Sequence, residues 1–198
     1  MMSIKKLLSL QFFLVLLIFF GKIQALEVAG IPVPETVVLE DKQNKLHLQG
    51  AGVRTKLFFD IYIGAFYATK KIETPQHALS NTGPKRMWLH FLYKKVSSNE
   101  YKDAWIDGIK ANNSEATVDH YKKEIDNFIS LFHEDLVAGD NLTLDYIPNK
   151  GTMVTMNGQL KAVIPGEGFY SILLSTWMGK KPPSQKFQDA LLSESTDD

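Results

Sequence analysis

The chain has 198 residues, a length that suggests one domain, and 44% of them are hydrophobic, enough for a folded core. Its formal net charge is zero and no stretch is dense in Lys or Arg, so the composition argues against a nucleic-acid partner. The chain has no cysteine, which excludes disulfides, thiolate catalysis and a lipid-modified cysteine anchor.

The first 25 residues have the pattern of a secretory signal peptide. Lys5 and Lys6 precede an apolar run from Leu7 to Phe20, and the segment ends at the small residue Ala25. The apolar run is shorter than the roughly 20 residues that span a bilayer. We therefore expect residues 1–25 to be a signal peptide and residues 26–198 to be one exported domain, periplasmic in a bacterium. The alternative is an uncleaved N-terminal anchor, which would then be the contact of the protein with a membrane.

The first half of the domain is predicted to consist of strands. Prolines 32 and 34 favour an extended lead-in, and strands are expected at 36–40 and 45–49. The next residues, Gly50-Ala51-Gly52, indicate a bulge or a close approach of another backbone. Residues 57–68 and 86–96 are rich in aromatic and β-branched side chains, which is typical of central strands.

Helices and strands form separate blocks in the second half. Ser97 and Glu100 fit a capping box at the start of one helix, and a second amphipathic helix is expected from about 114 to 134. A strand at 142–147 precedes a hairpin, 152–156 and 159–164, with a type I′ turn at Asn157-Gly158. Helices at 167–178 and 184–192 end the domain. This order predicts an α+β fold, an antiparallel sheet with a helical layer packed on one face.

The sequence carries no motif for nucleotide or metal chemistry. The segment Gly50-Ala51-Gly52 lacks the third glycine and the helix of a dinucleotide site, and the five histidines lack the spacing of a zinc-binding helix. There is no Gly-x-Ser-x-Gly motif, although a Ser-His-Asp triad dispersed along the chain would leave no local signature. We therefore predict no metal site and no cofactor.

Arg54 is unusual in this chain. It follows the glycines and precedes an apolar strand, and the only other arginine is Arg86. A guanidinium in apolar surroundings is costly unless it meets an anion, and its planar fork suits a carboxylate or a phenolate. The alternative is an ordinary pairing at a strand edge with Asp60, Asp145 or a carbonyl group. Arg54 is therefore a candidate anion-binding residue.

The segment from Gly50 through Arg54 to Tyr67 resembles the chalcone isomerase family, which has a Gly-x-Gly-x-Arg turn before a long aromatic strand. Tyr101 and the segment 175–184, with its Trp-Met-Gly and Pro-Pro-Ser sequences, match the family as well. The resemblance covers residues 27–192 and is greatest to the bacterial exported branch. It implies a chalcone-isomerase-like open-faced sandwich with a ligand cleft between sheet and helices.

The resemblance also implies roles for particular residues. Arg54 matches the arginine that holds a phenolate, and Tyr101 matches the tyrosine that positions water on a ketone. These two are the catalytic candidates if the chain is an enzyme. Thr176 matches a threonine that contacts the ligand, and Trp177 matches its neighbour. For Thr176 the alternative is a hydroxyl bonded to its own helix, and for Trp177 it is core packing.

This sequence departs from the family at two positions. The catalytic strand threonine is replaced by Tyr62, and the helix asparagine falls near Gly108. These departures argue against cyclisation, whereas Arg54 with Tyr62 would make a good carboxylate clamp. Packing within the strand is the alternative for Tyr62. The candidate ligand-binding residues are Arg54, Tyr62, Tyr101, Trp105, Thr176 and Trp177.

Three functions remain open at this stage. The first is a binding protein for a small lipophilic anion such as a fatty acid. The second is an intramolecular lyase or isomerase acting on a phenolic enone, so enzyme activity is undecided. The third is a structural role in the cell envelope without a ligand. In the first case, the apolar tail is expected among Phe58, Phe66, Trp105, Ile109 and Trp177.

Overall fold

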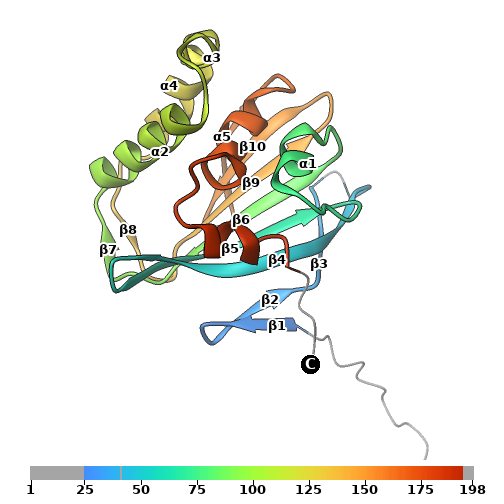
Figure 1. The fold of residues 1–198 in the computed structure, drawn as a ribbon, viewed down its shortest axis with the longest axis vertical. Coiled ribbons are helices and arrows are strands. Elements are labelled where there is room, and N and C mark those ends of the chain that lie inside the picture. Colours follow the sequence, from blue (N-terminus) through green and yellow to red (C-terminus); the bar gives the residue numbers. More distant parts are fainter. Residues whose placement is uncertain (1–24, 41, 194–198) are drawn as a thin grey trace, which may run out of the picture.

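The structure is a computed structural model that describes residues 25–40 and 42–193. Its centre is a seven-stranded antiparallel sheet with the strand order β11-β10-β9-β6-β5-β4-β3 (Figure 1). The predicted antiparallel sheet is confirmed. Its strands are β3 (Thr36–Val38), β4 (Lys45–Lys56), β5 (Phe59–Ala68), β6 (Lys85–Phe91), β9 (Asn141–Ile147), β10 (Gly151–Met156) and β11 (Gln159–Ile164).

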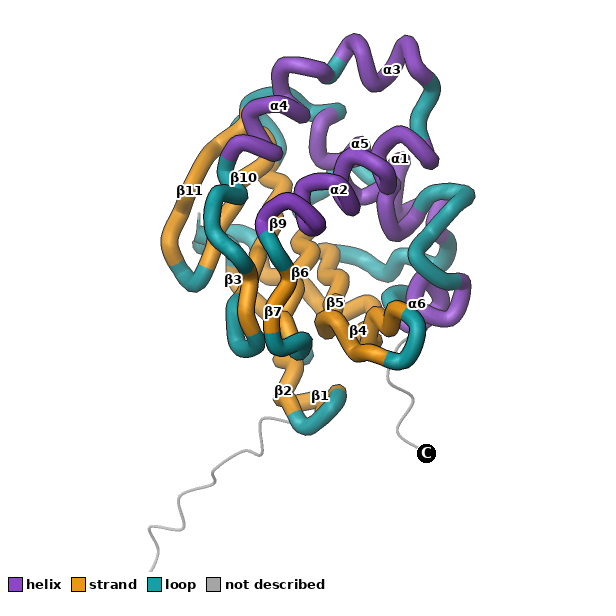
Figure 2. The backbone as a smooth tube through the Cα atoms, turned by 90° about the vertical axis from the view of Figure 1, so that its left-hand side faces the viewer, coloured by secondary structure: helices purple, strands orange, loops and turns teal. Residues whose placement is uncertain are grey.

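The helices lie on one face of this sheet, as predicted (Figure 2). The larger apolar cluster fills the space between the two layers. At its centre is α5, in which every residue except Ser171 is buried, because both the sheet and the other helices pack against it. The helices are α1 (Pro75–Ser80), α2 (Ser98–Asn112), α3 (Glu115–His120), α4 (Lys122–Ser130), α5 (Phe169–Met178) and α6 (Gln185–Ala190).

A second, smaller apolar cluster covers the opposite face of the sheet. It includes Val33, Ile63 and Tyr67, and a hairpin of β1 (Ala25–Val28) and β2 (Ile31–Pro34) lies on this side (Figure 1). The sequence predicted only an extended lead-in here. The hairpin was missed because its turn is Ala29-Gly30, both at positive φ, rather than the usual Asn-Gly or Asp-Gly.

The Gly50-Ala51-Gly52 segment is the place where α6 packs directly on the sheet. A Cβ atom at Gly50 would clash with the carbonyl oxygen of Ala190 and lie 2.7 Å from the carbonyl carbon of Leu191. The pairing of β4 with β5 also shifts register between Leu48 and Gly50. The sequence suggested a bulge or a close backbone approach, and the structure contains both.

Several predicted elements have different bounds in the structure. The helix expected over 114–134 breaks at Tyr121 into α3 and α4. The strand expected over 86–96 ends at Phe91, and a separate two-stranded ladder joins β7 (Lys95–Val96) to β8 (Leu136–Val137). The short helix α1, capped by Thr74, was not predicted.

Local signals that rest on hydrogen bonds were reliable. Ser97 and Glu100 form the predicted capping box at the start of α2. Asn157 and Gly158 both have positive φ, as a type I′ turn requires.

The predicted signal peptide lies almost entirely outside the described residues. Within the described residues, no helix is both long and apolar enough to cross a membrane.

Candidate functional site

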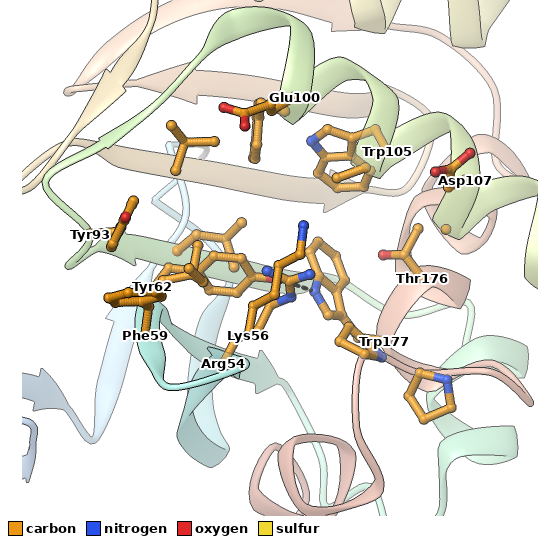
Figure 3. A pocket seen from close by; sticks show the side chains of 18 of the residues that line it. Arg54, Lys56, Phe59, Tyr62, Tyr93, Glu100, Trp105, Asp107, Thr176 and Trp177 are labelled. Carbon is orange, nitrogen blue, oxygen red and sulfur yellow. Dashed lines mark hydrogen bonds between the residues drawn. The ribbon is translucent and has the colours of Figure 1, made fainter.

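A cavity of about 630 Å³ lies between the β4–β5 end of the sheet, helix α2 and the end of α5 (Figure 3). Its wall brings together residues that are more than a hundred positions apart in the sequence. All six candidate ligand-binding residues line it: Arg54 from β4, Tyr62 from β5, Tyr101 and Trp105 from α2, and Thr176 and Trp177 from α5.

Arg54 and Tyr62 are directly opposite each other on β4 and β5. Opposite residues on antiparallel strands place their side chains on the same face, so the pair is set by the strand register. The Cζ atom of Arg54 lies 5.5 Å from the centroid of the Tyr62 ring, which is cation–π geometry. The sheet itself therefore holds the guanidinium beside the phenol.

The ordinary ion pairs considered for Arg54 are not formed. Asp60 accepts a hydrogen bond from Thr55 at 2.9 Å, and Asp145 is held by Arg86 at 2.6 Å. Among the residues that the structure describes, no carboxylate pairs with the half-buried Arg54. Its charge thus faces the cavity side of the sheet without a counterion from the described chain.

Tyr62 is also held from the helical layer. The indole Nε1 of Trp177 donates a hydrogen bond of 2.8 Å to the Tyr62 hydroxyl oxygen (Figure 3). Burial raises the pKa of Tyr62, against the opposing effects of the Arg54 charge and the Trp177 hydrogen bond. The phenol is therefore neutral at physiological pH. Because its oxygen is the acceptor in the bond to Trp177, its proton remains available for a hydrogen bond to another group.

Tyr101 and Trp105 bring two more polar atoms to the wall of the cavity. Within the described part of the chain, neither the Tyr101 hydroxyl nor the Trp105 Nε1 forms a well-aligned hydrogen bond, although both atoms are buried and interact weakly with each other. Burial is the main cause that raises the pKa of Tyr101, against the lowering effect of this weak interaction, so this phenol is also neutral. Buried polar groups without partners are uncommon and costly, and they mark a place where a partner would be favourable.

The Thr176 hydroxyl is bonded within its own helix, which is the alternative to ligand contact considered for it above. The hydroxyl donates to the carbonyl oxygen of Leu173 at 2.8 Å, so the proton is used within α5. A Cβ atom at Gly108 would lie 3.1 Å from Cγ2 of Thr176, so α2 and α5 approach closely here. A larger side chain at position 108 would require Thr176 to shift.

Sequence reasoning missed the charged rim of the cavity. Lys56, Lys95 and Lys181 line it together with two acids, Glu100 and Asp107. Lys95 is paired with Asp135 at 2.7 Å. Exposed lysines are common and carry no local sign that they surround a cavity, so only the fold could identify them. The resulting surroundings are more basic than acidic.

The expected apolar tail site is partly wrong. Trp105 and Trp177 line the cavity, with ring centroids 5.1 Å apart, as expected. Phe66 and Ile109 belong to the core and do not line it. Phe58 is 94% exposed, because residues 57–58 form a turn rather than the start of the strand.

In the described part of the chain, no group of three or more His, Asp or Glu side chains could hold a metal ion. The polar groups of the cavity wall are one guanidinium, three lysines, three phenols, two indoles, the Thr176 hydroxyl and the carboxylates of Glu100 and Asp107. Most of these groups donate hydrogen bonds and the cationic ones have no acceptor capacity, whereas the two carboxylates only accept. The arrangement is therefore suited to a ligand with an anionic or strongly accepting group.

Comparisons with known proteins agree with this fold. A family model described as chalcone isomerase-like matches residues 25–193. The crystal structure of a fatty-acid binding protein from Arabidopsis thaliana is similar, with a TM-score of 0.57 and 15% sequence identity, over 80% of this chain and 96% of that one. A comparison with curated proteins found no matching sequence. Since the family match spans nearly the whole described chain, this protein belongs to the chalcone isomerase-like family.

Proposed function

We propose that this protein binds a small lipophilic anion, such as a fatty acid, in the cavity between the sheet and the helices. The observation that carries the proposal is Arg54, a half-buried cation at a cavity, which forms no ion pair with any carboxylate of the described chain. The anionic head group would lie at Arg54 and Tyr62. The guanidinium supplies charge-assisted hydrogen bonds and the phenol supplies its free proton.

The rest of the wall suits a hydrocarbon tail. Apolar side chains from both layers line it, and each CH₂ group that leaves water contributes about 0.8 kcal/mol. A cavity of about 630 Å³ falls in the range of small-molecule sites. These lining residues are Leu57, Phe59, Ile61, Leu89, Val96, Ala104, Trp105 and Trp177.

The structural similarity to a plant fatty-acid binding protein is a separate line of support for the same proposal. The likeness shows a shared fold, and the fatty acid is a property of that protein. For this chain, the argument for an anionic ligand rests on Arg54 and its surroundings.

We further propose that the domain is exported, belongs to the bacterial exported branch and works in the periplasm. This proposal rests on the pattern of residues 1–25.

Ring closure of a phenolic enone receives less support from the site. That reaction relies on a strand threonine and a tyrosine to position water, and Tyr62 stands at the threonine position. The hydroxyl of Thr176 is engaged with Leu173. Arg54 and Tyr101 alone could hold a phenolate, but they lack the partners that would polarise the ketone. Binding is therefore the function that the geometry supports best.

The proposal predicts that the protein prefers an acid to a neutral amphiphile of equal length. Delipidated protein would be titrated with dodecanoate and with dodecanol, in parallel with organic extraction and mass spectrometry of the protein as purified. We expect the acid to bind about 10- to 100-fold more tightly, because only the acid can use the charge of Arg54. Equal affinities for the two compounds would contradict an anion site.

The Tyr101→Phe variant should show whether the Tyr101 hydroxyl contributes to ligand binding or only affects the stability of the folded protein. Removing a buried hydroxyl that forms no well-aligned hydrogen bond in the described chain is expected to raise the free energy of unfolding of the empty protein by about 1 kcal/mol. If Tyr101 turns its proton to the ligand, the same change should weaken dodecanoate binding about fivefold. Urea unfolding and ligand titration measure the two quantities. A loss of stability without a change in affinity would assign Tyr101 to the core alone.

A further inference from the structure

The turn between β4 and β5 carries the two most exposed large apolar side chains of the described residues, Leu57 and Phe58, and Phe59 follows them at the start of β5. Leu57 is 82%, Phe58 94% and Phe59 52% exposed. These three are consecutive, and Figure 1 shows the turn at the free end of the β4–β5 hairpin, beside β7 and β8. Together with the preceding residue, Lys56, these residues are called the hairpin tip (Lys56–Phe59) below.

The fold does not explain these side chains. Leu57 has a φ of 58°, in the left-handed region that favours glycine or asparagine, so a bulky residue there is strained. Phe58 contributes almost no buried area to either apolar cluster. A polar turn would serve the hairpin better, so the apolar residues are best explained by a contact outside the chain.

The surroundings of the hairpin tip indicate what kind of surface it would contact. The ring of Phe59 lies 5.3 Å from the ring of Tyr93, an aromatic side chain with a polar end. Lys56, which precedes Leu57, and Lys94, which follows Tyr93, are both exposed. Apolar side chains at a protruding turn, bordered by tyrosine and lysine, are typical of segments that enter the interface of an anionic membrane.

A lipid surface fits the shape of the tip better than a protein partner does. A stable protein interface needs about 800 Å² on each side, much more than three side chains at one turn provide. Acyl chains can enclose a narrow protrusion, and anionic head groups can meet the lysines. Leu57 and Phe59 also line the cavity, so insertion would place the cavity mouth at the bilayer.

We propose that the hairpin tip docks onto an anionic lipid bilayer and brings the mouth of the cavity to the membrane surface. This contact would let a lipophilic ligand pass between bilayer and cavity without crossing water. The docking itself depends on the exposed side chains and the lysines, and it stands whichever ligand the cavity holds.

The absence of cysteine from the 198-residue chain allows a local test with a single introduced label. A Phe58→Cys variant labelled with an environment-sensitive fluorophore would be mixed with vesicles of phosphatidylglycerol and phosphatidylcholine in equal parts. Half of the samples would contain acyl-chain spin-labelled lipid as a quencher. The matched control is Leu160→Cys, at a side chain that is 47% exposed on β11, at the far edge of the sheet. A local probe reports on the tip even if residues 1–25 also contact the vesicles.

We expect a blue shift and quenching at position 58, with little change at position 160 and a weaker effect on pure phosphatidylcholine. Adding Leu57→Asn, which suits the positive φ, should weaken the partition of the tip by about fivefold to tenfold, because one apolar anchor is lost. No change at position 58, or equal changes at both positions, would overturn the proposal. A shift that grows with protein concentration without vesicles would mean that a second copy covers the tip, and would overturn it as well.

Discussion

Replacing Arg54 with alanine is expected to weaken dodecanoate binding by about 100-fold. Charged hydrogen bonds contribute about 1.5 to 3 kcal/mol each, and 1.4 kcal/mol corresponds to a tenfold change in affinity. The empty protein should remain folded, because the described chain offers Arg54 no ion pair and its main internal contact is with the ring of Tyr62. Titration of the delipidated variant and a thermal melt measure the two effects.

Two further variants test whether the loss of dodecanoate affinity is specific to the Arg54 guanidinium. Lys70→Ala removes the same charge at an exposed site outside the cavity wall and should leave the affinity unchanged. Arg54→Lys keeps the charge but loses the planar fork, so we expect an intermediate loss of about tenfold. If Arg54→Ala and Lys70→Ala bind dodecanoate equally well, the head group lies elsewhere. That result would contradict the proposal that Arg54 binds the anionic ligand.

The second large effect is expected from Gly50→Val, which should lower the free energy of unfolding by roughly 3 kcal/mol. The new side chain would meet the backbone of Ala190, Leu191 and Ser193, and backbone atoms cannot rotate away as side chains can. The end of α6 would have to leave the sheet. Urea unfolding followed by circular dichroism measures the change.

The effect of Gly50→Val should extend to the cavity. In α6, Phe187 packs edge-on against Tyr62 with ring centroids 5.8 Å apart, and Gln188 donates to the carbonyl oxygens of Trp177 and Gly179. Displacing α6 removes both supports, so dodecanoate affinity should fall as well. The control is Ala51→Val on the neighbouring, half-buried residue, which should change stability by less than about 1 kcal/mol. Equal losses in both variants would show that the tight contact of Gly50 is not the cause.

The sequence predicted the parts of the site that depend on local pattern. Arg54 was identified because it follows a glycine pair and is one of only two arginines. The helix that carries Tyr101 and Trp105 was placed correctly because a capping box fixes where it begins. The glycine pair itself signalled a close approach, although nothing in the sequence indicated that α6 would make it.

Other features depend on register and on tertiary contacts, which a sequence pattern does not contain. Phe58 was expected in the cavity because the strand was assumed to begin at Leu57, but the chain turns at these residues and β5 begins at Phe59. A register shift after Arg54 further changes which side chains face inward. The lack of well-aligned hydrogen bonds at Tyr101 and Trp105 could not be predicted either, since a hydrogen-bond partner from a distant segment leaves no local mark.

The two apolar clusters on opposite faces of the sheet have a consequence for how such a protein can change over evolutionary time. The outer cluster, with Ile63 and Tyr67, keeps the sheet anchored on the face away from the cavity. The inner cluster anchors the helices largely through α5. Cavity-wall residues such as Tyr62 and Trp177 also belong to the inner cluster, so substitutions there change the inner anchor but leave the outer cluster intact. A domain built in this way can acquire new ligands through changes on one face while the other face keeps the sheet folded.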